Sequence, residues 1–403
     1  MSTSRPLERQ AEGSTESSTE PAFAESASGE SDGGAVAFEG THSLGSPLKS
    51  TLKSIRALRF GPVSLRYYPR ALAVSGILVV LLLAAVALHL AFGGTPLSYP
   101  DVIAALFGDT SKKKIHLAVT EFRAPRTMAA VLVGACLAAA GAITQTVARN
   151  PLASPDVLGV TAGASFGAVT VLVIGGGGHA GLSGAAALIG MPAAAFAAGI
   201  ISGTAVYALA YRRGIDSYRL VLVGLGISGL AASLTTWILT LGDVTSAAQA
   251  LTWMMGSLNG KDWAIVQPMA AAAVVLLAAA LLCGRWLLLA SFGEDTAVGL
   301  GARVGRIRLT ALSLAVLLAA VATVVAGPVA FVALASPQVA RMISRSVVPP
   351  IALSALVGAV FVLLADTVSA NALSAPLPVG VATAVVGAPY LIYLILKYQR
   401  RLT

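Results

Sequence analysis

Two arginines three residues apart, Arg123 and Arg126 in the stretch EFRAPR, have the spacing that most suggests a binding function. They stand at the expected start of an apolar helix, where residues three apart share a face. Guanidinium groups on one face could bind acidic groups of a soluble partner. Contact with lipid headgroups, or an ion pair with Glu121, would explain them equally well.

A second stretch with possible chemistry is GEDTAVGLGARVG, residues 293–305. It predicts a short helix with an acidic first turn, followed by a glycine break and a basic segment. Such an element would suit docking into a groove of a cytoplasmic subunit. A plain surface loop is the alternative.

The rest of the sequence does not indicate catalysis or a bound cofactor. GLGISG, residues 224–229, matches GxGxxG but lies in an apolar run without a preceding strand, so helix packing is the better reading. GSLNGKD, residues 256–262, is too short between its glycines for a phosphate-binding Walker A loop. Neither the four histidines nor Cys136 and Cys283 have metal-ligand spacing. We expect no cofactor, no metal site and no catalytic residue, so any ATP hydrolysis must come from another chain.

Membrane helices must position these residues. Of 403 residues, 56% are hydrophobic and 11% are charged, whereas about a quarter are charged in soluble domains. Several apolar runs reach the ~20 residues that cross a bilayer. Ionisable groups are scarce in them, Asp366 being the clearest, which argues against ion-coupled transport. We predict ten spans, near residues 71–92, 127–148, 157–175, 185–211, 218–241, 264–290, 306–326, 328–344, 350–371 and 378–397.

The formal charge of +9 is explained by where the charged residues lie relative to the predicted spans, and it does not indicate nucleic-acid binding. Residues 1–46 carry eight acids among many Ser and Gly, which predicts a disordered acidic tail. Residues 47–70 carry six bases and no acid, which predicts a basic juxtamembrane segment on the cytoplasmic side. Residues 71–403 form the transmembrane domain. With ten spans, 21 of the 27 Lys and Arg lie inside and both termini are cytoplasmic.

From about Ala71 to its end, the sequence resembles the membrane permeases of ABC importers for iron–siderophores, haem and cobalamin, the FecCD-like family. The order and spacing of several segments carry this resemblance. They are RAPRTMAAVLVGACLAAAGAITQTVARNPLASPDVLGVTAGASFG (123–167), GEDTAVGLGARV (293–304), GPVAFVALASPQVARMI (327–343), LLADTVSANAL (363–373) and LPVGVATAVVGAPYLIYLILK (377–397).

The resemblance implies an all-α polytopic membrane protein of the type II ABC importer permease kind. Its expected partners are a second permease, identical or different, two cytoplasmic ATP-binding subunits, and an extracytoplasmic substrate-binding protein. Arg123 and Arg126 would contact that binding protein. The segment that couples to the ATPases would comprise Gly293, Glu294, Asp295, Thr296, Ala297, Val298, Gly299, Leu300 and Gly301.

The stretch QTVARNPLASPDVLGVTAGASFGA, residues 145–168, has two possible roles. Its composition favours a linker, with Pro151 and Pro155 ending one helix and a stripe of Gly159, Gly163 and Gly167 packing the next. The resemblance favours a gate instead. Asn150, Leu152 and Ser217 would then border the cytoplasmic mouth of the transport path.

Three positions depart from the family pattern: Ala370 replaces an Arg, Pro376 replaces an acid, and Gln338 replaces a His. The expected function is translocation of a ferric siderophore across the cytoplasmic membrane by an importer whose ATPases are separate chains. Haem or cobalamin transport is the alternative within the family. An ATP-independent secondary transporter or a non-transporting membrane scaffold is the alternative outside it.

Overall fold

The computed structural model describes residues 56–60, 63–67, 69–93, 96–175, 185–211, 217–371 and 377–399. These residues belong to one compact unit, Ser54–Thr403. Residues 1–53, which include the predicted acidic tail, lie outside the described part.

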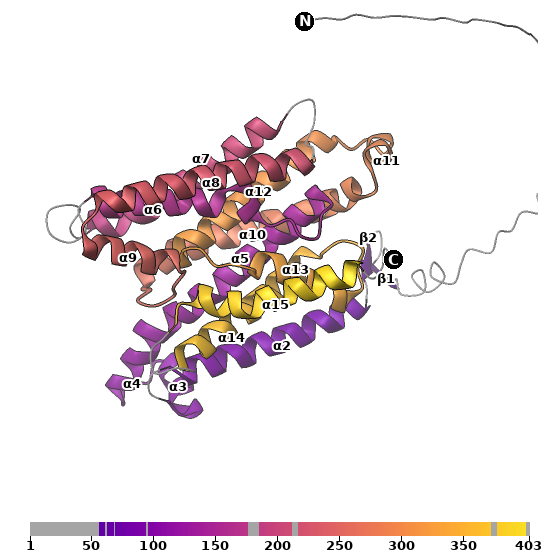
Figure 1. Ribbon diagram of the computed structural model, residues 1–403. Coiled ribbons are helices and arrows are strands. Elements are labelled where there is room, and N and C mark those ends of the chain that lie inside the picture. The colour runs from indigo at the N-terminus through magenta and orange to yellow at the C-terminus, as the bar shows by residue number, and fades with distance from the viewer. Residues whose placement is uncertain are drawn as a thin grey trace, which may run out of the picture. The chain divides into compact units, whose positions relative to one another are not determined.

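Helices dominate this unit (Figure 1). The elements are β1 (Arg56–Phe60), β2 (Val63–Tyr67), α2 (Pro69–Ala91), α3 (Tyr99–Leu106), α4 (Lys113–Leu117), the π-helix η1 (Ala118–Arg123), α5 (Ala124–Ala148), the 3₁₀-helix η2 (Pro155–Leu158), α6 (Val160–Ile174), α7 (Ala185–Ala210), α8 (Ser217–Leu241), α9 (Val244–Met254), α10 (Trp263–Ser291), α11 (Glu294–Gly299), α12 (Val304–Ala326), α13 (Val332–Ser344), α14 (Ile351–Asn371) and α15 (Val379–Gln399).

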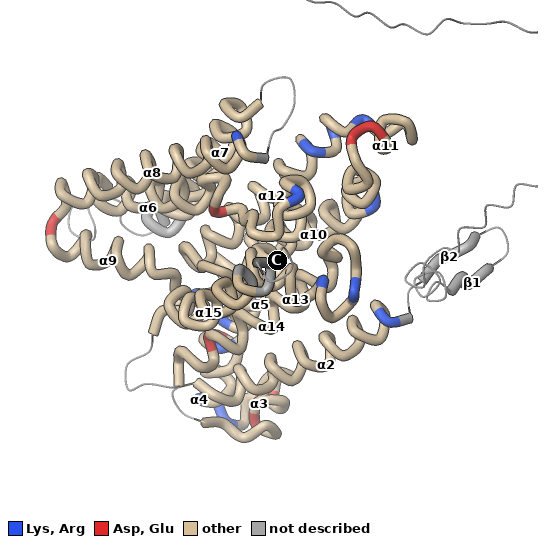
Figure 2. Tube along the Cα trace, turned by 45° about the vertical axis from the view of Figure 1, so that its right-hand side comes forward, with Lys and Arg blue, Asp and Glu red and all other residues tan. Residues whose placement is uncertain are grey.

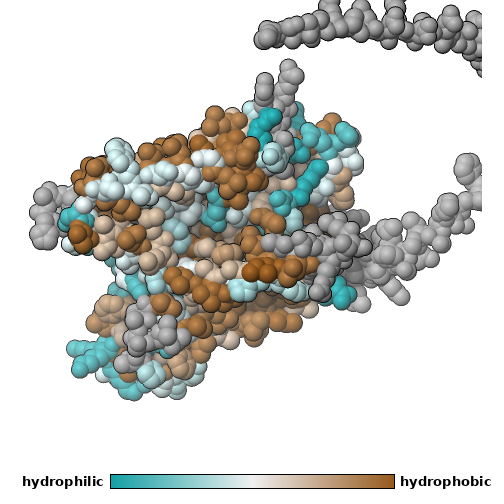
Figure 3. All heavy atoms as spheres, in the orientation of Figure 1, coloured by the Kyte–Doolittle hydropathy of each residue, from teal (hydrophilic) through white to brown (hydrophobic). Residues whose placement is uncertain are grey.

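The predicted all-α membrane class is confirmed, and a helix matches each predicted span. Seven helices in the described residues are long and apolar enough to cross a membrane, and α6 and α15 contribute shorter apolar stretches. Helix α13, with 13 residues, is about 20 Å long and too short for a ~30 Å hydrocarbon layer. Figure 3 shows hydrophobic residues along the helices, with hydrophilic residues near the ends that carry α3, α4 and α11.

Helices α5, α12 and α14 form the interior. Over the most apolar 18 residues of each helix, 83% of the residues are buried in Lys113–Ala148, which contains α5. The corresponding share in Arg70–Ala91, most of α2, is 11%. Gly134 of α5 and Gly358 of α14 explain how closely two of these helices approach, because a Cβ on either would overlap the backbone of the other. Small residues allow such approach between membrane helices.

The predicted glycine stripe at the start of the third span also packs as expected. Gly163 and Gly167 of α6 lie against α7, and a Cβ on either would overlap Ala198 or Ala194 there. Gly159 adopts φ +69°, between η2 and α6.

Helix α13 begins beside α5 and completes no crossing alone. Residues 327–331 join α12 to α13, and a Cβ on Gly141 of α5 would overlap the carbonyl of Ala333. Phe331, the residue before α13, adopts a left-handed φ of 64°, which is uncommon for a bulky residue.

Part of the predicted juxtamembrane segment forms a hairpin that sequence reasoning did not foresee. Strands β1 and β2 pair antiparallel, with Arg56 opposite Tyr67 and Phe60 opposite Val63. The loops also contain unforeseen helices: α3, α4 and η1 before α5, and α9 before α10.

Candidate functional site

Arg126 forms a buried ion pair that joins two helices. Its Nε donates to Asp366 Oδ2 at 2.7 Å and its Nη2 donates to Oδ1 at 2.9 Å, linking α5 to α14. The Asp366 side chain is 1% exposed and the Arg126 side chain 23% exposed. The carboxylate that contacts Arg126 is therefore Asp366, 240 residues away in the sequence, and not the neighbouring Glu121.

His89 of α2 joins the same cluster. Its Nε2 lies 2.8 Å from Asp366 Oδ2, and its Nδ1 lies 2.8 Å from Thr127 Oγ1. Thr127 in turn donates its hydroxyl hydrogen to the carbonyl of Arg123. Both ring nitrogens are thus within hydrogen-bond distance of an oxygen, so the imidazole links α2 to α5 and α14.

Arg123 holds the end of α2. Its Nη1 donates to the carbonyls of Leu90 and Ala91 at 2.8 and 3.0 Å, and its Nη2 donates to the carbonyl of Gly93 at 2.6 Å. The carbonyls of Leu90 and Ala91 belong to the last turn of α2, where a cation complements the helix dipole. The two arginines are close in sequence but make separate contacts.

The surface beside these arginines comes from α3, α4 and η1. Lys112 pairs with Asp101 at 2.7 Å. Phe107 is 89% exposed and Phe122 67% exposed. Exposed aromatic side chains such as these are enriched in protein interfaces.

Arg149, Asn150 and Leu152 form a tight turn after α5, at the opposite end of that helix. Arg149 adopts φ 49° and donates from Nη2 to the carbonyl of Ala290, near the end of α10. Asn150 Oδ1 accepts from the backbone N–H of Leu152 at 2.9 Å, which is an Asx turn. Helix α5 thus ends at Ala148, before Pro151. Leu152 is 39% exposed.

A buried pair of amides attaches this turn to α13. Gln338 Nε2 donates to Gln145 Oε1 at 2.5 Å and to the carbonyl of Pro151 at 3.3 Å. Gln145 Nε2 donates to the carbonyl of Leu334 at 3.0 Å. Gln338, noted above only as a departure from the family pattern, is therefore what connects the turn to the short helix.

The segment after the turn is held equally closely. Asp156 of η2 accepts from the hydroxyl of Thr161. Burial raises the pKa of the Asp156 carboxyl, and hydrogen bonds from Thr161 and Ser154 lower it in part. Gly224 of α8 packs on η2, where a Cβ would overlap the carbonyl of Val157. This confirms the packing role expected of GLGISG at Gly224 but not at Gly226 or Gly229, which have open space around them.

The predicted short helix is present as α11. Glu294 and Asp295 form its acidic first turn, and Glu294 pairs with Arg308 of α12 at 3.3 Å. Ala297 is buried, whereas Val298 and Leu300 are 58% and 64% exposed. Figure 2 shows this acidic helix with Lys and Arg positions gathered around it.

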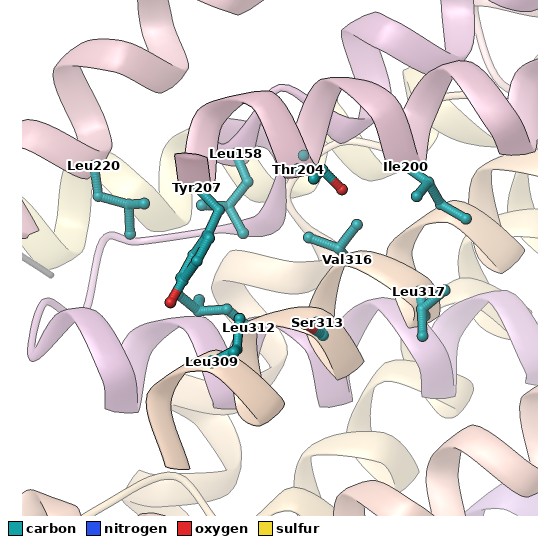
Figure 4. Close-up of a pocket in the computed structure, with 11 residues that line it drawn as sticks. Leu158, Ile200, Thr204, Tyr207, Leu220, Leu309, Leu312, Ser313, Val316 and Leu317 are labelled. Atoms are coloured by element: carbon teal, nitrogen blue, oxygen red, sulfur yellow. The ribbon is translucent and has the colours of Figure 1, made fainter. Parts of the chain in front are cut away.

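An apolar cavity of about 260 Å³ lies between α7, α8, α12 and η2 (Figure 4). Small-molecule sites usually exceed about 300 Å³ and hold several convergent polar groups. Only hydroxyls interrupt this lining, which suits neither a charged nor a bulky chelate. The lining residues are Leu158, Ile200, Gly203, Thr204, Tyr207, Leu220, Leu309, Leu312, Ser313, Val316 and Leu317.

The other predicted positions add little. Within the described residues no group of three or more His, Cys, Asp or Glu could hold a metal ion, and Cys136 and Cys283 are buried thiols. Ser217 is the first residue of α8, but its side chain lies outside the described part, as does Pro376. Ala370 lies in the last turn of α14.

Comparison with known proteins identifies the relatives of this chain. The model of the FecCD transport family matches residues 81–397. The ferric enterobactin transport system permease protein FepG of Escherichia coli (strain K12) is 39% identical, over 77% of this chain and 91% of its own. The iron(3+)-hydroxamate import system permease protein FhuG of Bacillus subtilis (strain 168) is 37% identical, over 70% and 84%. A solved transporter described as of the metal-chelate ABC type, in an inward-facing conformation, has a TM-score of 0.71 at 25% identity, covering 82% of this chain and all of its own.

Proposed function

Since the chain belongs to the FecCD transport family, we propose that it is the membrane permease subunit of an ABC importer that carries a ferric siderophore across the cytoplasmic membrane. The observation that carries this proposal is the family match over residues 81–397. Relatives are named for ferric enterobactin, iron(3+)-hydroxamate and Fe(3+)-citrate. Iron(3+) held by an organic chelator is the substrate class they share.

The complex we propose contains this subunit, a second permease, two cytoplasmic ATP-binding subunits and an extracytoplasmic binding protein. ATP hydrolysis belongs to the partner chains. The end of the molecule that carries α11 would be cytoplasmic, because it holds Arg149, Arg285, Arg303, Arg306, Arg308, Arg341 and Arg345. The positive-inside rule favours the cytoplasm for such a cluster, and we propose that both termini are cytoplasmic as well.

Docking of the binding protein would use the surface of α3, α4 and η1 together with Arg123 and Arg126. Two donors of Arg126, those on Nη1, are not used by Asp366 and could bind a partner carboxylate. Arg123 would contribute its charge while it fixes this surface to the end of α2.

Coupling would use residues 293–301. Ala297 anchors α11, while Val298 and Leu300 are exposed to a partner. A rigid-body shift of α11 on ATP binding would reach α12 through the contact between Glu294 and Arg308. The turn with Asn150 and Leu152, and Ser217 at the start of α8, would form the cytoplasmic gate. Gln338 fixes that turn to α13.

Uptake of iron-loaded chelates by cells grown without iron, with and without this chain, tests the function. We expect ⁵⁵Fe-siderophore uptake to be lost on deletion and restored by the chain only together with its ATPase. Labelled haem and cobalamin are the comparison substrates. If the chain restores uptake of only one of these, that compound replaces the ferric siderophore as the proposed substrate. Transport by the purified chain in vesicles without any ATPase would contradict the ABC mechanism and favour a secondary transporter.

A further inference from the structure

A groove between α10 and α12 opens beside α11, the coupling helix of the proposed function. Its volume is about 410 Å³, and it is formed by Cys283 and Trp286 of α10 with residues from Gly301 to Thr310. Its floor is apolar: Cys283 is 9% exposed, and Ile307 is partly buried. Its lining also includes Arg303 and Arg306, which are both exposed.

These two arginines form no ion pair within the part of the chain that the structure describes. The nearby Arg308 pairs with Glu294, but no ion pair is found there for Arg303 or Arg306. A third cation, Arg285, stacks on the Trp286 ring at 5.4 Å from its centroid. The lining of the groove is therefore strongly positive and complements an anion.

The distance that the groove extends along the two helices indicates what kind of anion fits. Thr310 lies six residues into α12 from Val304, about 9 Å along the helix axis. Cys283 lies eight residues before the end of α10, about 12 Å along that axis. The floor thus runs into the membrane-spanning part of both helices, which a water-soluble partner does not enter. Trp286 is 44% exposed and would lie near the membrane–water interface, where tryptophan is enriched.

We propose that this groove binds an anionic phospholipid from the leaflet at the α11 end, with the phosphate between Arg303 and Arg306 and an acyl chain along Cys283 and Ile307. Basic pockets between membrane helices favour such headgroups. The lipid would lie against the segment that joins α11 to α12, so it would stabilise the position of the coupling helix. The inference requires only that α10 and α12 span the membrane, and it stands whichever chelate is transported.

Native mass spectrometry of the purified full-length chain tests the proposal. The protein is exchanged into detergent with equal amounts of phosphatidylglycerol and phosphatidylcholine that carry the same acyl chains. We expect one retained phosphatidylglycerol, with a preference of about tenfold over phosphatidylcholine, since each arginine near a membrane surface contributes to such binding. The double variant Arg303→Gln/Arg306→Gln should lose that preference.

The matched control is Arg219→Gln/Arg345→Gln, which removes two arginines at the same end of the molecule but outside the groove. It should retain the preference. The proposal is overturned if both double variants lose the preference for phosphatidylglycerol equally, or if neither loses it. Glycerol phosphate is added in a separate arm, because displacement of the lipid by this soluble headgroup at equal concentration would assign the arginines to a free anion.

Fluorescence then locates the lipid. Trp286 is made the only tryptophan by changing Trp237, Trp253 and Trp263 to Phe, and its quenching by brominated lipids is measured in vesicles. We expect brominated phosphatidylglycerol to quench more strongly than brominated phosphatidylcholine, and the difference to vanish in the Arg303→Gln/Arg306→Gln background. Equal quenching by both lipids in the single-tryptophan chain overturns the site. Loss of ATPase binding in the arginine variant with lipid retention unchanged would make the groove a protein contact instead.

Discussion

Arg126 and Asp366 meet through two hydrogen bonds of 2.7 and 2.9 Å between α5 and α14. Such a two-point contact between a guanidinium and a carboxylate is stronger and more specific in geometry than a single hydrogen bond. His89 adds a contact from α2 to the same carboxylate. Three helices are thus fixed to one another near the surface that we propose for docking.

Asp366→Asn should destabilise the protein, because it leaves the partly buried Arg126 without its counter-charge. Breaking a buried pair from one side costs about 3 kcal/mol. Arg126→Gln should be similarly destabilising, and the double variant should recover part of the loss. Thermal unfolding in detergent measures all three. Strict additivity of the single effects would show that the two side chains are not coupled.

Docking of the binding protein should depend on the charge of Arg126 rather than on the ion pair. Arg126→Gln/Asp366→Asn removes both charges while keeping similar shapes, and we expect affinity for the binding protein to fall about tenfold at low salt. Asp366→Asn alone keeps the arginine and should keep the affinity. Surface plasmon resonance at 50 and 500 mM salt measures both. Unchanged affinity of the double variant at low salt would exclude Arg126 from docking.

Gln338→Leu should loosen the turn after α5. It leaves the Gln145 amide oxygen and the carbonyl of Pro151 without the donor they share, and a buried unsatisfied group costs about 1–3 kcal/mol. Gln338→His can still donate and should be milder. Ser336→Ala is the control on the same helix, because the Ser336 hydroxyl is buried without a partner among the described residues. Thermal unfolding compares the three, and a Gln338→Leu chain as stable as Ser336→Ala would contradict the role.

Gly224→Ala and Gly226→Ala should behave oppositely, although they are two residues apart. A Cβ at Gly224 overlaps the carbonyl of Val157, whereas a Cβ at Gly226 meets nothing within 4 Å. We expect Gly224→Ala to separate α8 from η2 and lower both stability and uptake. Gly226→Ala should be neutral or stabilising by up to about 1 kcal/mol, from helix propensity. Equal effects on stability and uptake at the two positions would contradict the packing of α8 on η2.

Val298→Ala with Leu300→Ala should weaken binding of the ATPase, since both side chains are exposed and truncation removes apolar surface that the partner would bury. We expect about a tenfold loss of affinity and a matching loss of uptake. Leu281→Ala with Leu282→Ala, two exposed leucines within α10, is the control and should leave ATPase binding intact. Co-purification with titrated ATPase measures the difference. Equal binding by both variants would remove α11 from the interface.

Sequence reasoning succeeded where the signal is local or cumulative. Ten apolar segments, the glycine stripe from Gly159 to Gly167, the acidic first turn of α11 and the ordered family segments each depend on residues near one another in the chain. The short α13 was assigned as a segment for the same reason. Strands β1 and β2 and the small helices α3, α4 and α9 were missed, because short elements carry too weak a periodic signal.

The contacts between distant segments were decided only by the tertiary structure. Arg126 and Asp366 are 240 positions apart and Gln145 and Gln338 are 193 positions apart, so neither pair could be read from spacing. Buried charged and amide side chains are costly in a membrane protein unless they are paired, because the lipid offers them no partner. The sequence alone determines which side chains have that need, while helix packing decides which partner each one meets. That is why Arg123 and Arg126, alike and only three residues apart in the sequence, hold two different parts of the fold.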